Sequence, residues 1–207
     1  MIKNLFPSPI YTNNGSMKLL LDVQKTVSVL PKINEIRSHS TNGGYQSEPK
    51  IFENNCESIN TLKKFISDEV KQYCPILFEA LSGRDFNGDL PQFELWGWIT
   101  SLGPGGFNPP HIHPRSTISG IYYIKTPSTI LQNSERNFGK WLGFMDPRSN
   151  SQIWPISSHL NYFHIPPVEG SIVLFPSFLQ HFVPPFNGNG DRTAIAFNLR
   201  HKQSIYY

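Results

Sequence analysis

The feature that most constrains the fold of this chain is a change of pattern at Pro91. Beyond it, short apolar or alternating segments are separated by Gly, Pro and Asn, which is typical of the strands of a β-sandwich or barrel. The turn at residues 167–170 predicts a hairpin, because its glycine can take the positive φ that tight turns require. Strands are expected at residues 93–100, 118–125, 142–145, 162–165, 171–175 and 193–199.

The N-terminal part of the chain has a helical pattern instead. Apolar residues recur at intervals of three and four between residues 59 and 81, which places them on one face of a helix. Gly83 is expected to end this helix, and Pro75 is expected to kink or split it. A second, weaker helical segment covers residues 16–30 and is closed by Pro31.

Helices followed by strands predict one mainly β domain over residues 1–207, with the helices packed on the outside of an antiparallel β-structure. Residues 1–90 would form mostly helical support, and residues 91–200 the β core. Aromatic residues make up 13% of the chain and charged residues 16%, which is the profile of a folded protein. The net charge of +3, without a basic cluster, argues against nucleic acid as a partner.

The sequence contains no segment that predicts a membrane span. Its longest apolar run, residues 18–30, is interrupted by polar and charged residues, and the N-terminus lacks a secretory hydrophobic region. We therefore expect a cytoplasmic protein with no membrane partner. The two cysteines, Cys56 and Cys74, lack metal-binding or redox spacing and are expected to be reduced structural thiols.

Two histidines, His111 and His113, stand one residue apart in a segment rich in proline. In an extended chain alternate side chains point the same way, so both rings can converge while Ile112 faces the other side. Imidazole is a common metal ligand, but two imidazoles make an incomplete site. A turn rich in Pro and His on a surface loop is the alternative. His181, after the strand-like segment 171–175, is the candidate for a third ligand.

Arg192 follows His181 by eleven residues and opens the last predicted strand. Ala194 and Ala196 share its face of that strand, so a guanidinium there has room to project into a cavity. Its planar fork can bind a carboxylate through two hydrogen bonds. A surface ion pair is the alternative for an isolated arginine, and the neighbouring His181 favours the cavity.

Taken together, these segments resemble the iron(II)- and 2-oxoglutarate-dependent oxygenases, in particular their prolyl-hydroxylase-like branch. The resemblance implies a double-stranded β-helix, which is a jelly roll or cupin-like barrel of eight strands, over about residues 93–200. The N-terminal helices would support this barrel from outside. The matching segments are residues 111–113, 118–124, 170–175, 181–183 and 192–198.

The resemblance also implies roles for individual residues. His111 and His181 would hold Fe(II), with the residue two positions after His111 as the third ligand, and no catalytic side chain is implied beyond the metal ligands. Arg192 would bind the distal carboxylate of 2-oxoglutarate, with Tyr123 as a helper. The cofactors would be Fe(II) and 2-oxoglutarate, and O₂ would hydroxylate a peptide or small molecule while 2-oxoglutarate becomes succinate and CO₂.

The chain departs from the family at the third ligand, where the family carries Asp or Glu and this chain has His113. A carboxylate partly neutralises Fe(II), so a neutral imidazole leaves the site one charge more positive. Three interpretations stay open: His113 is a ligand in a three-histidine site, it stands aside for Asp or water, or the site is inactive.

Two other functions compete with the oxygenase. A three-histidine dioxygenase of the cupin type would oxidise its substrate without a keto acid, and it would not need Arg192. A non-enzymatic jelly-roll binding module would bind no iron. The primary substrate is left open, because substrate selection in such barrels rests on loops, here expected at residues 102–110 and 126–140.

Overall fold

The computed structural model describes residues 6–30, 41–131, 140–148 and 162–202. In these residues the named strands pair antiparallel and outnumber the helices. The elements in chain order are β1 (Tyr11–Asn14), α1 (Met17–Val29), β2 (Asn42–Gln46), the 3₁₀ helix η1 (Ile51–Glu53), α2 (Glu57–Ser82), β3 (Phe93–His111), β4 (Ile118–Lys125), α3 (Ser128–Leu131), β5 (Leu142–Met145), β6 (Tyr162–Ile165), β7 (Ser171–Pro176), β8 (His181–Val183) and β9 (Arg192–His201).

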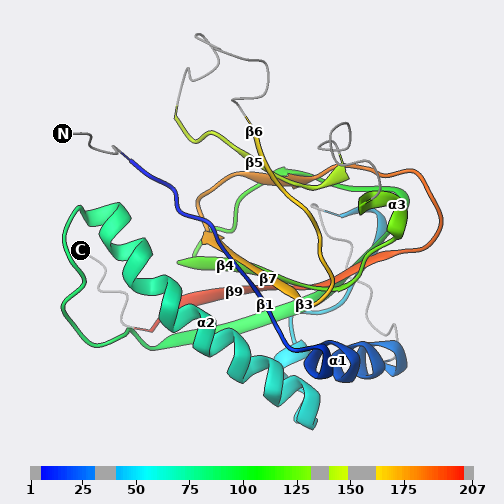
Figure 1. Cartoon of the computed structure of the whole chain (residues 1–207), viewed down its shortest axis with the longest axis horizontal. Coiled ribbons are helices and arrows are strands. Elements are labelled where there is room, and N and C mark those ends of the chain that lie inside the picture. Colours follow the sequence, from blue (N-terminus) through cyan, green and yellow to red (C-terminus); the bar gives the residue numbers. More distant parts are fainter. Residues whose placement is uncertain (1–5, 31–40, 132–139, 149–161, 203–207) are drawn as a thin grey trace.

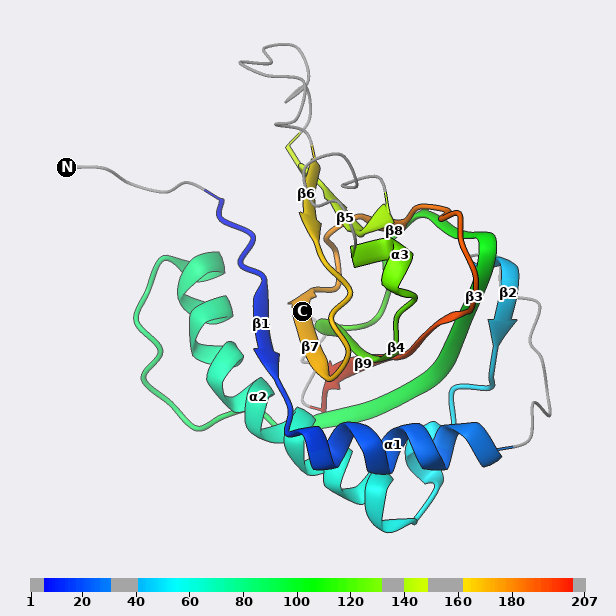
Figure 2. The same cartoon turned by 45° about the vertical axis from the view of Figure 1, so that its right-hand side comes forward.

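The strands form two facing layers that share β3. The major sheet has the order β1-β7-β4-β9-β3, with β2 added beyond β3, and the minor sheet has the order β3-β8-β5-β6. The helices α1 and α2 lie together against the outer face of the major sheet, and the minor sheet lies over its inner face (Figures 1 and 2). This is the predicted mainly β architecture with flanking helices, a jelly roll.

The outer face of the major sheet is covered by the two predicted helices. Ser16 caps α1 by accepting a hydrogen bond from the backbone N–H of Leu19 at 3.2 Å, and Gly83 ends α2 in the left-handed conformation with φ 67°. The core cluster on this side joins both helices to β4, β7 and β9 through the buried residues Leu19, Val23, Ile59, Leu62, Ile66, Val70, Tyr73, Ile118, Tyr122, Ile172, Leu174, Ile195 and Phe197.

Pro75 lies inside α2 but does not split it, because the helix continues from Glu57 to Ser82. A proline in a helix interior removes one hydrogen bond and costs about 3 kcal/mol. Tyr73 and Leu77, on either side of Pro75, are buried against the sheet, and this burial offsets the cost. Of the two outcomes predicted for Pro75, a kink or a split, the split is therefore wrong.

The inner face of the major sheet forms a second core with the minor sheet. Alternation along the strands sends Tyr123 inward while Tyr122 faces the helices, and it sends Val173 and Phe175 inward while Ile172 faces the helices. The inward residues pack against the minor sheet in a cluster that includes Leu142, Phe144, Ile165 and Leu179. The space between the sheets is thus filled at one end and open near β8 and the start of β9, where the candidate site lies.

Two strands in the N-terminal part join the sheets in addition to the helical support. β1 pairs with β7 along the edge of the major sheet, and β2 pairs with β3. Tyr11 donates a hydrogen bond from its hydroxyl to Glu69 Oε2 at 2.6 Å, and the side-chain amide of Asn13 donates to the same oxygen at 2.9 Å. These bonds tie β1 to α2.

Two predictions about loops are wrong. The turn at residues 167–170 contains Gly170 with the predicted positive φ of 79°, but it connects β6 of the minor sheet to β7 of the major sheet and makes no hairpin. Residues 102–110, expected to form a loop, lie within β3. Their glycines allow close approach of β2, since a Cβ on Gly106 would lie 2.5 Å from the carbonyl oxygen of Gly43.

The remaining sequence predictions concern thiols and membranes. Cys56 and Cys74 are both free. Among the described helices, none is long and apolar enough to span a bilayer. The predicted loop at residues 126–140 falls partly on 132–139, which are outside the described residues.

Candidate metal centre

Three histidines from two distant segments meet at the cavity between the sheets. His111 ends β3, His113 follows two residues later, and His181 opens β8. His111 and His181 are direct partners across the β3–β8 ladder, and such partners have side chains on the same face. Ile112 is 46% exposed. The structure thus brings together the two rings that alternation predicts and adds the third.

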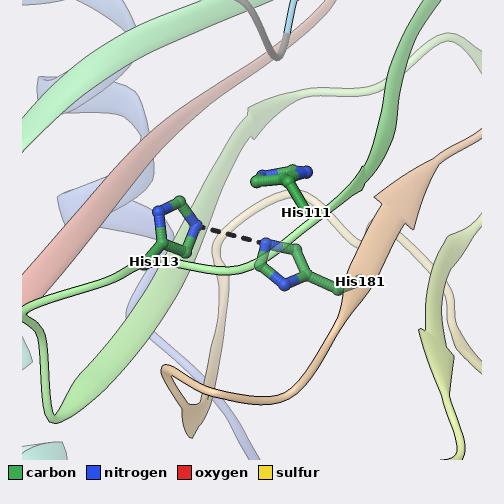
Figure 3. Close-up of side chains that lie close together, drawn as sticks. All are labelled: His111, His113 and His181. Carbon is green, nitrogen blue, oxygen red and sulfur yellow. Dashed lines mark hydrogen bonds between the residues drawn. The ribbon is translucent and has the colours of Figure 1, made fainter.

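The three rings are close enough to share one ion (Figure 3). Ring centroids lie 4.3 Å apart for His111 and His181, 5.1 Å for His111 and His113, and 5.0 Å for His113 and His181. One nitrogen from each ring lies within 4.8 Å of the others. In the described part of the chain, this is the one group of three or more His, Cys, Asp or Glu side chains with ligand atoms so close together.

Backbone carbonyl groups fix the protonation of two of the rings. His111 Nδ1 lies 2.7 Å from the carbonyl oxygen of Pro109, and His181 Nδ1 lies 2.9 Å from that of Leu179. A carbonyl oxygen only accepts, so each Nδ1 carries the proton and donates. The lone pair of each ring is then on Nε2, and this is the usual way in which an outer hydrogen bond orients a metal-binding histidine.

His113 is the third member of the histidine group and lies between His181 and Trp98. Its Nε2 lies 3.2 Å from His181 Nε2 (dashed line in Figure 3), and its ring packs beside Trp98 at 5.8 Å between centroids. An imidazole nitrogen lies about 2.1 Å from a bound zinc ion, so two such nitrogens lie roughly 3.4 Å apart at a tetrahedral angle and roughly 3.0 Å apart at a right angle. The observed spacing therefore fits two nitrogens that share an ion, and the donor set suits a first-row transition metal.

Burial keeps the three rings in the neutral form that binds metals. It lowers the pKa of His113 to about 4, with a smaller contribution from His111. Burial also lowers the pKa of His111. The pKa of His181, which is 3% exposed, is well below its ordinary value through burial first and the two neighbouring imidazoles second. At neutral pH no ring has to lose a proton before an ion binds.

The cavity beside the histidines is floored by the central strand β9. Ala194 lies between Thr100 of β3 and Tyr123 of β4, its partners on either side, and these three residues form one row across the sheet. The next row has Ala196 in its centre, flanked by Trp98 and Ile121. All six residues line the cavity. The two small alanines leave open the space between the larger flanking side chains.

Arg192 lies one row beyond Ala194, opposite Leu102, and lines the same cavity. It is 4% exposed. Its Nη1 donates to the carbonyl oxygen of Lys140 at 2.8 Å and its Nη2 to that of Pro184 at 3.1 Å, and the guanidinium lies 5.5 Å from the centroid of the Phe186 ring.

No carboxylate of the described residues pairs with Arg192. Burial lowers its pKa to about 10, and Tyr123 acts against this shift to a smaller extent. The cavity therefore holds a buried positive charge with no described counter-ion. Buried charges are normally paired, so this end of the cavity is suited to an anion.

The contacts of Trp96, Trp98 and Asn198 show which of these strand residues belong to the cavity. Trp98 lines the cavity, while Trp96 packs under Arg200, whose guanidinium carbon lies 5.8 Å from the ring centroid. Asn198 is buried and accepts a hydrogen bond from Ser119 Oγ at 2.7 Å. Trp98 therefore belongs to the cavity wall, and Asn198 is a satisfied core amide.

The sequence did not indicate two polar residues of the cavity wall. Gln46 comes from β2, a short Gly-rich strand without an alternating pattern. Thr100 is an inward polar position on β3, and the sequence signal was its parity with Trp98. Alternation alone could have selected Thr100, whereas Gln46 depends on the pairing of β2 with β3.

A family model described as "Putative 2OG-Fe(II) oxygenase" matches residues 97–198 of the chain. The matched region runs from β3 to β9 and contains the three histidines, Tyr123 and Arg192. A comparison with curated protein sequences gives no match.

The chain is also similar to solved structures, at identities so low that the likeness concerns the fold. A prolyl-4-hydroxylase from Pseudomonas putida is 13% identical, with 93% of this chain and 92% of that chain covered and a TM-score of 0.56. A Trichoplax adhaerens prolyl hydroxylase, solved with a hypoxia inducible factor peptide fragment, is 15% identical, with 94% and 84% covered and a TM-score of 0.57. HygX from Streptomyces hygroscopicus, solved with nickel and 2-oxoglutarate, is 9% identical, with 95% and 84% covered and a TM-score of 0.63; it was also solved with hygromycin B.

Proposed function

Because the chain belongs to the superfamily of iron(II)- and 2-oxoglutarate-dependent oxygenases, we propose that it is a dioxygenase that hydroxylates a peptide or small molecule. His111, His113 and His181 hold Fe(II) in this proposal. Arg192 binds the distal carboxylate of 2-oxoglutarate, and Tyr123 assists it. The substrate classes correspond to the bound molecules of two similar structures, a peptide fragment in one and hygromycin B in the other.

One observation carries this proposal: three neutral imidazoles and a buried guanidinium without a described carboxylate partner line the same cavity. The imidazoles suit a transition metal, and the guanidinium suits an anion. A dicarboxylic keto acid satisfies both ends, since its keto acid group can bind the metal and its distal carboxylate can bind the guanidinium.

When bound together, Fe(II) and 2-oxoglutarate supply the oxidative chemistry in which O₂ is consumed, succinate and CO₂ are released and a substrate C–H bond is hydroxylated. The protein supplies the binding and orientation. Carbonyl groups of Pro109 and Leu179 hold the rings of His111 and His181 with Nε2 toward the centre. Arg192 fixes the far end of the diacid and so orients it toward the metal.

His113 takes the position of the family's carboxylate, and we infer that it is a ligand. Its Nε2 faces His181 Nε2 at 3.2 Å. In the described residues no Asp or Glu belongs to the histidine group; Asp146, for example, is paired with Arg148. No Asp or Glu of the described residues could therefore replace His113 as the third ligand. This supports the three-histidine interpretation over one in which His113 stands aside.

Arg192 also argues against a three-histidine dioxygenase that works without a keto acid. Such an enzyme would have to bury an arginine in its cavity with nothing for it to bind, and burial of an unpaired charge is costly. The same argument applies to a non-enzymatic module.

Anaerobic titration tests the proposal. Fe(II) and 2-oxoglutarate added together should give a weak visible charge-transfer band, and His181→Ala should abolish both the band and tight iron binding. His164→Ala is the matched control, because His164 lies on β6 outside the histidine group. His113→Ala should also weaken iron binding; unchanged affinity would remove His113 from the ligand set. A missing band in protein that contains iron would refute the keto-acid assignment.

A further inference from the structure

A buried hydroxyl group without a partner lies in the wall of the cavity. Four side-chain oxygens of the described residues are buried without a hydrogen bond to another described group: those of Thr100, Ser116, Tyr122 and Thr129. Of these four residues, Thr100 is the one that lines the cavity. An unsatisfied buried hydroxyl costs about 1–3 kcal/mol, so this group is suited to a bond that forms only when the cavity is filled.

The register of the sheet shows which end of a ligand Thr100 would meet. Along the inner face of β3, Leu102 is opposite Arg192, Thr100 is one row further in, and Trp98 is the next row, beside His113. Successive inward rows are about 6.6 Å apart along a strand. Thr100 therefore lies between the guanidinium end and the metal end of the cavity, in the row next to the guanidinium.

Tyr123 lies in the same row on the other side of Ala194. Thr100 and Tyr123 thus flank the alanine from the two neighbouring strands, and all three side chains are on the inner face. Tyr123 is 4% exposed, and burial raises the pKa of its phenol, which therefore stays protonated and able to donate. The row thus provides two hydroxyl-bearing residues that line the cavity, one row from Arg192.

We propose that Thr100 Oγ1 donates a hydrogen bond to the distal carboxylate of the bound diacid, and that it is a binding residue of this site together with Arg192 and Tyr123. This inference rests on the proposed function. A carboxylate held by Arg192 has further lone pairs to satisfy, and Thr100 presents the unsatisfied donor nearest to it in the strand register. Thr100 thereby contributes to the selection of a diacid over a monoacid.

The test is the affinity of nickel-loaded protein for two keto acids, measured by calorimetry. One is 2-oxoglutarate, and the other is 2-oxopentanoate, which has the same chain length but a methyl group in place of the distal carboxylate. A hydrogen bond to a charged group contributes about 1.5–3 kcal/mol. Thr100→Val should therefore bind 2-oxoglutarate roughly 10-fold to 100-fold more weakly, and it should bind 2-oxopentanoate at least as well as the wild type.

The adjacent hydroxyl pair on the opposite face provides the matched control. Ser101 Oγ and Thr193 Oγ1 are hydrogen-bonded at 2.9 Å, so Thr193→Val leaves a partner unsatisfied. This control should lower the thermal midpoint and leave 2-oxoglutarate affinity unchanged. Thr100→Val removes a hydroxyl that has no described partner, so it should not lower the midpoint of the ligand-free protein. Thr100→Ser, which keeps the hydroxyl, should restore most of the affinity.

The possible results separate the two claims. If the wild type binds 2-oxoglutarate and Thr100→Val binds it equally well, the role of Thr100 is wrong and the proposed function stands. Equal losses for both keto acids would show a general disturbance of the cavity and would also overturn it. If valine is not accommodated, Thr100→Ala removes the same hydroxyl with a smaller side chain and is judged in the same way. A wild type that binds neither acid would overturn the inference and the proposed function together.

Discussion

Replacing Arg192 with methionine should separate the effect of its buried charge on folding stability from its contribution to diacid binding. Methionine has a similar length without the charge. The pKa of Arg192 falls from its ordinary 12.5 to about 10 through burial, and at ~1.4 kcal/mol per pKa unit this corresponds to about 3 kcal/mol for keeping the group charged. The two hydrogen bonds to the carbonyl oxygens of Lys140 and Pro184 contribute about 1 kcal/mol each. The stability gained by removing the buried charge and the stability lost with the two hydrogen bonds therefore nearly cancel.

We therefore expect the ligand-free Arg192→Met variant to keep its stability within about 1 kcal/mol, or ~2–4 °C in thermal midpoint for a chain of this size. The effect of a diacid should be very different. In the wild type, 2-oxoglutarate at 100 times its dissociation constant stabilises by about 2.7 kcal/mol. Loss of one partner of a buried charge pair costs about 2–5 kcal/mol in binding, so the stabilisation at the same ligand concentration should fall below about 1 kcal/mol.

The assay is a thermal unfolding series of nickel-loaded protein with and without 2-oxoglutarate. Metal binding by the variant should be unchanged, because Arg192 is not in the histidine group. A variant that keeps the full ligand-induced shift would show that Arg192 does not bind the diacid. A ligand-free variant destabilised by more than about 4 kcal/mol would show that the arginine serves the fold, and the charge argument would fail.

Three further outcomes are expected. His113→Asp should keep iron affinity within about tenfold, since it restores a carboxylate ligand, whereas His113→Ala should lose at least ~10-fold in a competition titration; equal losses in both would contradict the ligand role. The pKa of His113 is depressed to about 4 in the folded state, so the unfolded chain binds more protons than the folded chain between about pH 6.5 and pH 4. The metal-free protein should therefore lose ~2 kcal/mol of stability from this ring alone when the pH falls from 7 to 5. Equal denaturant midpoints at pH 7 and pH 5 would contradict this. Gly120→Ala would place a Cβ 2.4 Å from Phe197 Cζ and should cost about 1–3 kcal/mol in chemical denaturation, while Gly88→Ala, with nothing within 4 Å, serves as the control that should not change.

The sequence predicted those strands whose burial leaves a local pattern of alternating or consecutive apolar residues. β4, β5 and β6 have the predicted bounds, because alternation or an apolar run marks each of them. β1 and β2 carry Asn, Gly and Thr instead, and they are held by pairing at the sheet and by bonds such as those of Asn13 to Glu69. Such strands depend on neighbours that are distant in the chain, so no local pattern predicts them.

In the candidate site, too, some features follow from a local sequence pattern and others depend on strand pairing. The convergence of His111 and His113 follows from alternation, which is local. Their meeting with His181 depends on the β3–β8 pairing, and β8 has only three residues, too few for a periodic signal. The unsatisfied hydroxyl of Thr100 depends on its two neighbouring strands. A missing hydrogen-bond partner is a property of the folded structure, so the sequence alone cannot indicate it.

The direct opposition of His111 and His181 across two strands has a consequence for folding. An ion held by both rings would act as a crosslink that closes a long intervening loop, and it would restrict the unfolded chain much as a disulfide does. It would also lock the strand register, because a slip by one residue turns a side chain to the other face. Amide hydrogens of β5 and β8 should therefore exchange more slowly once metal is bound, while those of α1 and α2, on the far face of the major sheet, should change little.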